Sequence, residues 1–175
     1  MPLVREINYN GYTFRSKIEA SWAYLFDQLG IEYYYENETF SLENNSGGTT
    51  NYLPDFFLPD MDCFLEVKLE RKPTVEECVK CYLLAVQTGK DVVMVYQTIG
   101  TIQYDAYIYE GTTGEFDNQY RLTMCPMCCA FGFTHLGIVG GLSCECRVRC
   151  AGLANDRCIR IKAAIDKTRK NRFGA

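Results

Sequence analysis

The chain has 175 residues, 47% hydrophobic and 14% aromatic, which suits one ordinary core with a small appendage rather than two full domains. No apolar run approaches the roughly 20 residues that a membrane span needs, and the N-terminus lacks the apolar stretch of a signal peptide. We therefore expect a cytoplasmic protein with no membrane partner. Cytosolic thiols stay reduced, so metal binding is the leading use for those of the ten cysteines that cluster.

The net charge of −4 is unevenly distributed along the chain. Residues 1–142 hold 9 Lys and Arg against 19 Asp and Glu, whereas residues 143–175 hold 9 against 3. The basic C-terminal part therefore suits nucleic-acid phosphates, and the acidic body suits cations.

The first predicted element is a helix. Ser16 followed three positions later by Glu19 has the form of a capping box, and apolar residues at helical spacing continue as far as Gly30. This pattern predicts a helix over about 16–29. Aromatic and β-branched runs then predict neighbouring, partly antiparallel strands. These runs are 33–36, 53–58 and 63–68, and the loop-like segment 44–51 is expected to join two strands.

A second capping-box form, Thr74 with Glu77, opens an amphipathic helix that ends near Gly89. A buried strand over 92–96 follows it, which completes a β-α-β crossover, and the segment 101–110 can add an edge strand. The predicted class is α/β, with a mixed sheet flanked by helices.

The composition changes near residue 122, so we divide the chain into 1–122 and 123–175. The second part is rich in cysteine and glycine and ends in a basic helix over 156–171. The predicted apolar residues of that helix are Ile159, Ala163, Ala164 and Ile165.

Charged residues stand in two otherwise apolar strands. Asp55 follows Pro54, and Glu66-Val67-Lys68 follows ten residues later. Since side chains alternate along a strand, Glu66 and Lys68 share one face, and Asp55 joins them if its strand pairs in register. Two carboxylates and the Val67 carbonyl would form an oxygen cage of the kind that Mg²⁺ prefers.

These residues have roles in phosphodiester chemistry. A bound ion can activate water and stabilise charge on the phosphate. Lys68 can orient or deprotonate the attacking water, and Glu19 can supply another carboxylate.

Three segments of the sequence resemble the PD-(D/E)XK nuclease superfamily. They are Arg15-Ser16-Lys17-Ile18-Glu19, Tyr52-Leu53-Pro54-Asp55-Phe56 and Phe64-Leu65-Glu66-Val67-Lys68. The match covers about residues 12–96 and is nearest to compact phage and transposon endonucleases, such as Holliday-junction-resolving enzymes and the end-cleaving subunit of heteromeric transposases.

The resemblance implies a restriction-endonuclease-like fold and Mg²⁺- or Mn²⁺-dependent cleavage of DNA. It implies that Glu19, Asp55 and Glu66 are the family's acids and that Lys68 is its lysine. A further helical Gln or Lys of some members corresponds to Gln87 or to Lys80, and the spacing does not choose between them.

Each residue also has a purely structural interpretation. Glu19 can be only a capping glutamate, Asp55 only a turn residue, and Glu66 with Lys68 a solvated pair on an amphipathic strand. The three motifs in this order, on the correct predicted elements, favour the nuclease.

Cysteine spacing in the second part predicts a structural zinc site. Cys125 and Cys128 have zinc-knuckle spacing, and we expect Cys144 and Cys146 to complete a tetrahedral set. Cys150 is the main substitute and His135 a weaker one. Cys129 stands where a knuckle usually has glycine, so the turn there is expected to be strained. The alternative is a group of buried free thiols. The C-x-x-C pair Cys78 and Cys81 lies inside a predicted helix and is interpreted as core.

The C-terminal cluster Lys167, Arg169, Lys170 and Arg172 can bind phosphates without reading sequence, or can be a solvated helix face. Combined, these features predict a DNA endonuclease with a zinc ribbon. The alternatives are a nuclease-fold accessory that holds DNA, and an enzyme that depends on a transposase-like partner. The expected partners are DNA and either a second copy in a homodimer or another protein.

Overall fold

Strands outnumber helices in the part of the chain that the structure, a computed structural model, describes. That part comprises residues 6–44, 47–68, 73–96, 106–111, 116–135, 153–154, 158–171 and 173. In chain order its elements are β1 (Ile7–Tyr9), β2 (Tyr12–Phe14), α1 (Lys17–Leu29), β3 (Tyr34–Tyr35), β4 (Phe40–Glu43), β5 (Thr49–Tyr52), β6 (Phe56–Leu58), the 3-10 helix η1 (Pro59–Met61), β7 (Cys63–Lys68), α2 (Val75–Thr88), β8 (Asp91–Tyr96), β9 (Ala106–Tyr109), β10 (Phe116–Met124), β11 (Phe131–His135), β12 (Leu153–Ala154) and α3 (Ile159–Lys170).

The central sheet is mixed and has the order β11-β10-β9-β8-β7-β6-β3, with β12 paired to β10. β7 and β8 are parallel, and α2 connects them in sequence, as predicted for a β-α-β unit. The other described neighbours in this sheet pair antiparallel. β1-β2 and β4-β5 form separate hairpins. The segment 44–51 joins two strands as predicted, but its residues 49–51 already belong to β5. The predicted α/β class with a mixed sheet is confirmed.

The position of β9 corrects one prediction. The sequence predicts an edge strand over 101–110, but β9 lies between β8 and β10. Ile108 and Tyr109 are buried there, and both backbone edges of the strand have a hydrogen-bonding neighbour. The predicted edge position is wrong because β10 pairs with β9. The mixed polar sequence of β10, FDNQYRLTM, does not have the pattern that predicts a long strand.

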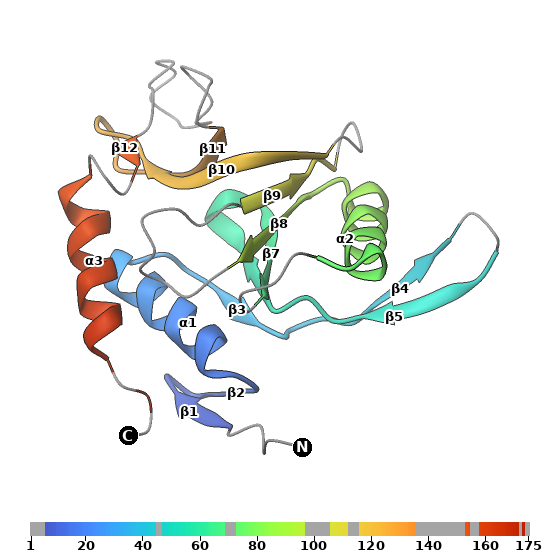
Figure 1. Ribbon diagram of the computed structural model, residues 1–175, viewed down its shortest axis with the longest axis horizontal. Coiled ribbons are helices and arrows are strands. Elements are labelled where there is room, and N and C mark those ends of the chain that lie inside the picture. Colours follow the sequence, from blue (N-terminus) through green and yellow to red (C-terminus); the bar gives the residue numbers. More distant parts are fainter. Residues whose placement is uncertain are drawn as a thin grey trace.

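The sheet separates two hydrophobic cores (Figure 1). α1 and α3 cover one face, where Trp22 and Phe26 are fully buried. α2 and the β4-β5 hairpin lie against the other face, around Leu42 and Leu84. β7 contributes to both cores because its side chains alternate. Cys63, Leu65 and Val67 belong to the first core, and Phe64 belongs to the second.

The helices α1 and α2 begin and end close to where the sequence predicts. Ser16 caps α1, and α2 begins with a complete capping box between Thr74 and Glu77. Gly30 and Gly89 end the two helices with φ of 73° and 69°, a left-handed conformation that glycine adopts without steric cost. These caps fix where each helix begins and ends.

α3 packs on α1 through one apolar side, which consists of Ile161, Ala164, Ile165 and Thr168. The helix was predicted from residue 156 and begins at Ile159, and residues 155–157 lie outside the described ranges. Ile159, predicted to be on the apolar face, is 86% exposed. None of the helices in the described ranges is long and apolar enough to cross a membrane.

The predicted division into 1–122 and 123–175 falls within β10, which pairs with β9 before that point and with β11 across it. The two parts therefore share one sheet, and a domain boundary at residue 122 stays a prediction.

Candidate active site

Strand pairing brings Asp55 and Glu66 together. β6 pairs with β7 with Phe56 opposite Leu65, so Asp55, which precedes β6, stands level with Glu66. The Asp55 backbone N–H donates to Glu66 Oε2 at 3.4 Å, and the Val67 N–H donates to Asp55 Oδ2 at 2.8 Å. Both carboxylates are buried, with exposed fractions of 4% and 5%.

Glu66 is held by two further side chains. The Tyr52 hydroxyl, at the end of β5, donates to Glu66 Oε2 at 2.8 Å. Lys68 Nζ lies 2.5 Å from the other oxygen, Oε1, and 3.7 Å from Glu77 Oε1 on α2. Glu66 and Lys68 therefore share a face of β7, as the strand periodicity predicts. Tyr52 also contacts the buried Cys81, with 3.6 Å between Oη and Sγ.

Glu19 reaches the same region from the first turn of α1. Its backbone N–H donates to Ser16 Oγ at 3.2 Å, but its carboxylate does not return to the Ser16 N–H as in a complete capping box. Instead Glu19 accepts the Ser16 hydroxyl at 2.6 Å, the Tyr35 hydroxyl at 2.5 Å and the Arg15 N–H at 3.2 Å. The interpretation of Glu19 as only a capping residue does not explain this set of contacts.

Arg15 connects two carboxylates. Its Nη2 lies 3.1 Å from Asp55 Oδ1 and also contacts Glu36 Oε1. The Arg15 side chain is 57% exposed, whereas the Asp55 side chain is 5% exposed. The guanidinium therefore sits at the surface while it touches a buried acid.

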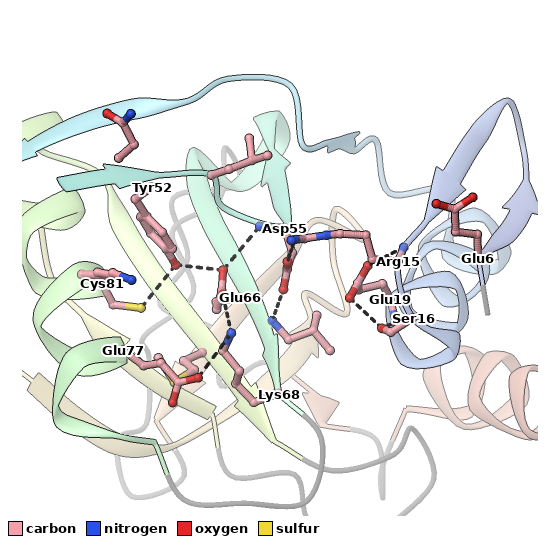
Figure 2. A pocket seen from close by; sticks show the side chains of 15 residues that line it. Glu6, Arg15, Ser16, Glu19, Tyr52, Asp55, Glu66, Lys68, Glu77 and Cys81 are labelled. Carbon is pink, nitrogen blue, oxygen red and sulfur yellow. Dashed lines mark hydrogen bonds and ion pairs between the residues drawn. The ribbon is translucent and has the colours of Figure 1, made fainter. Parts of the chain in front are cut away.

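A cavity of about 660 Å³ collects the four predicted catalytic residues Glu19, Asp55, Glu66 and Lys68. Figure 2 shows Asp55, Glu66 and Lys68 between two groups, with Tyr52 and Cys81 on one side and Arg15, Ser16 and Glu19 on the other. Lys80 also lines this cavity, whereas Gln87 Nε2 donates to the Glu43 carbonyl at 3.0 Å on the β4-β5 hairpin. Of these two alternatives, the structure places Lys80 at the site.

The charge balance of the cavity favours a cation. Five lining residues carry carboxylates and three carry cationic groups. Burial raises the pKa of Asp55 well above its usual range, and the charges of Glu66 and Glu19 raise it further. Burial opposes the charged form of Lys68, but Glu66, Asp55 and Glu77 outweigh that effect and raise the Lys68 pKa, so this amine keeps its proton at neutral pH.

The donor set suits a hard divalent ion. Mg²⁺ is usually held in proteins by one or two carboxylates together with waters and substrate phosphates, and here Asp55 and Glu66 can supply the carboxylates beside the Val67 backbone. No group of three His, Cys, Asp or Glu side chains able to hold a metal is found within the described residues.

Comparisons with family models, curated proteins and solved structures found no match. The function is therefore inferred from the geometry of this cavity and from the sequence.

Sequence reasoning gave no role to three residues that hold the acids in place. Arg15 and Tyr52 stand inside the segments that carry the family resemblance, and Tyr35 stands in a predicted strand. Their partners lie 14 to 40 positions away in the chain, so the contacts depend on the strand register. A tyrosine within a strand carries no local signal of such a contact.

The turn between β10 and β11 holds the first two predicted zinc ligands. The Cys125 N–H donates to the Ala130 carbonyl at 2.8 Å, and the Met127 N–H donates to Cys125 Sγ at 3.4 Å. Cys125 is buried and Cys128 is exposed. Cys129 has φ of 62°, the left-handed conformation expected at the glycine position of a knuckle. Cys144, Cys146 and Cys150 lie outside the described residues, as does the side chain of His135.

Three basic residues near the end of α3 lie away from its packed side, whereas Arg160 near its start donates to the Leu29 carbonyl of α1 and lies over the Phe131 ring. Lys167, Arg169 and Lys170 are exposed, and Arg172 lies outside the described residues. Arg169 Nη1 is 3.9 Å from Asp166 Oδ1, a surface pair that leaves the charge available.

Proposed function

We propose that this protein is a metal-dependent DNA endonuclease of the PD-(D/E)XK kind. The observation that carries the proposal is the convergence of Glu19, Asp55, Glu66 and Lys68 from α1, the β6 side and β7 on one cavity. Two buried acids with a lysine between carboxylates are costly to maintain without a ligand that uses them.

Each residue has a task in that proposal. Asp55 and Glu66, with the Val67 carbonyl, hold Mg²⁺ or Mn²⁺, which when bound supplies an activated water and stabilises charge on the phosphate. Lys68 orients the water and places a positive charge beside the reacting phosphate. Glu19, fixed by Ser16 and Tyr35, adds a carboxylate at the α1 side of the cavity.

DNA is the proposed substrate because of the basic C-terminal part. Half of all Lys and Arg fall within residues 143–175, and three of the predicted contacts, Lys167, Arg169 and Lys170, are exposed on α3. In this proposal Cys125 and Cys128 bind a structural zinc ion together with Cys144 and Cys146, and the ribbon and the basic helix hold the duplex. The Met127 N–H to Cys125 Sγ contact supports this use of the turn, because such contacts stabilise thiolate charge.

A cleavage panel tests the activity. Supercoiled, linear, single-stranded and branched DNA are incubated with the purified full chain and Mg²⁺, Mn²⁺ or EDTA. We expect cleavage with either ion and none with EDTA. Asp55→Ala and Glu66→Ala should abolish it, whereas Glu38→Gln, an exposed carboxylate outside the cavity, should not. Comparable cutting by Asp55→Ala would exclude the proposed site.

The same panel separates the enzyme from a DNA-holding accessory or a partner-dependent subunit. If the wild type binds DNA but does not cut any substrate with either ion, the accessory or the partner-dependent form replaces the proposal. Adding a transposase-like partner then distinguishes these two, because only the second gains activity.

A further inference from the structure

The donors around the two proposed metal ligands follow a pattern. In each carboxylate, a buried neutral group holds one oxygen and a cationic side chain holds the other. Val67 N–H donates to Asp55 Oδ2, and Arg15 contacts Asp55 Oδ1. Tyr52 donates to Glu66 Oε2, and Lys68 contacts Glu66 Oε1. The neutral donors fix the direction of each carboxylate, and the cations occupy the remaining oxygens.

Glu19 differs from both. Its two oxygens accept only neutral donors, the Ser16 and Tyr35 hydroxyls and the Arg15 backbone N–H. Among the three predicted catalytic acids, cationic side chains therefore stand at the two that are proposed to hold the ion. Lys68 already has a proposed catalytic task, but the Arg15 side chain has none.

Arg15 is built to exchange partners. Its guanidinium contacts Asp55, yet more than half of the Arg15 side chain is exposed. The same guanidinium also contacts a second carboxylate, that of Glu36. The guanidinium stays charged at any accessible pH, so it competes with any other cation for Asp55 Oδ1. A planar guanidinium is also suited to a phosphate.

We propose that Arg15 is a built-in counter-cation of the metal site, which neutralises Asp55 in the empty cavity and turns to a DNA phosphate when a divalent ion is bound. The proposal rests on the proposed function, because it takes Asp55 as a metal ligand. It adds a phosphate contact to the site and makes ion binding and the Arg15–Asp55 ion pair mutually exclusive.

Ion binding without DNA tests the competition directly. Titration calorimetry of the DNA-free full chain with Mn²⁺ compares the wild type with Arg15→Gln. A partly exposed ion pair contributes up to about 1 kcal/mol, and more where one partner is buried, so Arg15→Gln should bind Mn²⁺ about threefold to tenfold more tightly. Lys17→Gln is the matched control, because it removes an exposed positive charge two residues away with no contact to a cavity acid in the described structure. It should change the affinity by less than about twofold.

The same variant should have the opposite effect on the affinity for DNA. With Ca²⁺ present, and with DNA shown to remain intact, Arg15→Gln should bind a duplex more weakly and lower the salt dependence by up to about one log-log unit. Arg15→Lys should restore both properties toward the wild type, and thermal unfolding verifies that each variant is folded. A residue that only supported the fold would not tighten ion binding while it weakened DNA binding.

The outcomes separate this proposal from the one on which it rests. If the wild type binds no Mn²⁺, the metal site itself is wrong and both proposals fail. If the wild type binds Mn²⁺ and Arg15→Gln binds it equally or more weakly, the metal site stands and the counter-cation is rejected. Tighter ion binding with unchanged DNA binding would reject the phosphate contact.

Discussion

At the scale of single residues, the cavity is organised by neutral donors that aim its acids. Tyr35 and Tyr52 each donate one hydroxyl to one carboxylate, and burial raises the pKa of both phenols, so both remain donors at working pH. Residues that orient metal ligands usually change affinity or activity by about 10- to 100-fold when removed. Removing the hydroxyl of either tyrosine should therefore lower the proposed cleavage activity.

Tyr52→Phe tests that role. It removes the hydroxyl that fixes Glu66 Oε2 and leaves only the longer contact from the Asp55 N–H. We expect about a tenfold or greater loss of cleavage and a loss of about 1 to 2 kcal/mol in the free energy of unfolding. Tyr34→Phe is the control, because Tyr34 donates to Glu32 at 2.7 Å in an exposed position. Equal losses of cleavage and of stability in both variants would mean that Tyr52 has no special role in positioning Glu66.

Asp55 makes a prediction about pH. Burial, followed by the charges of Glu66 and Glu19, raises its pKa in the folded state. A raised folded-state pKa means that its contribution to stability is fully present below the unfolded pKa and is lost as pH rises through the folded pKa. In EDTA the wild type should therefore lose at least about 1 kcal/mol on going from acidic to alkaline pH relative to Asp55→Asn. Urea unfolding across that range measures the difference, and the exposed Asp60→Asn should behave as the wild type does.

At the scale of elements, the N-termini of α1 and α2 have similar capping sequences, but their glutamates have different proposed roles. Thr74 and Glu77 cap α2 and satisfy each other. Ser16 caps α1 and its hydroxyl donates to Glu19 Oε1 at 2.6 Å, as the Thr74 hydroxyl donates to Glu77 Oε2 at 2.9 Å, but of the two glutamates only Glu19 is a proposed catalytic acid. Ser16 thus links the stability of a helix end to the placement of a proposed catalytic acid.

Alanine at each cap distinguishes the two roles. Ser16→Ala and Thr74→Ala should each cost about 1 kcal/mol in the free energy of unfolding, since each removes one capping hydrogen bond. Only Ser16→Ala should also lower cleavage, by about tenfold, because Glu19 loses a donor. Chemical denaturation and cleavage rates measured on the same preparations decide the matter. A similar fall in activity for Thr74→Ala would show that the Ser16 contact to Glu19 has no special part in cleavage.

The elements also show how far the sequence leads. Caps and helical spacing place α1 and α2, and alternation along β7 places Glu66 and Lys68 on one face, because these signals are local. The interior position of β9 and the contacts of Arg15, Tyr35 and Tyr52 depend on which strands pair and in which register. That information lies in packing between distant segments, so no local pattern contains it.

The β10-β11 turn offers adjacent cysteines with different expected roles. Cys128 is a predicted zinc ligand, whereas Cys129 has φ of 62°, a strained conformation for a residue with a side chain. Cys128→Ser should abolish the binding of about one zinc ion per chain. Cys129→Gly should keep the zinc and raise the free energy of unfolding by about 0.5 to 1 kcal/mol. Elemental analysis and denaturation test both, and loss of zinc in Cys129→Gly would move the ligand to Cys129.

At the scale of the whole molecule, charge is segregated. The proposed metal cavity is lined by residues of α1, β7 and α2, whereas α3 packs against α1 (Figure 1). Lys167, Arg169 and Lys170 of α3 are exposed. An acidic body repels DNA in general, so a basic surface separate from the cavity would restrict the duplex to paths that touch α3. The chain would then bind DNA mainly through one surface and cut it at another.

Neutralising Lys167, Arg169, Lys170 and Arg172 together, with glutamine at each, tests this division of labour. Each bound phosphate releases counterions, so DNA binding should weaken similarly on every sequence, and its salt dependence should fall by up to about one log-log unit for each phosphate that the variant no longer binds.

Exchanging Lys for Arg and Arg for Lys at the same four positions is the matched control. It keeps every charge and should keep the slope. Because Lys167, Arg169 and Lys170 do not line the cavity, saturating DNA should restore much of the cutting rate. Binding titrations over a range of salt concentrations measure the slope, and an unchanged slope in the glutamine variant would show that α3 presents only a solvated face and that the duplex is held elsewhere.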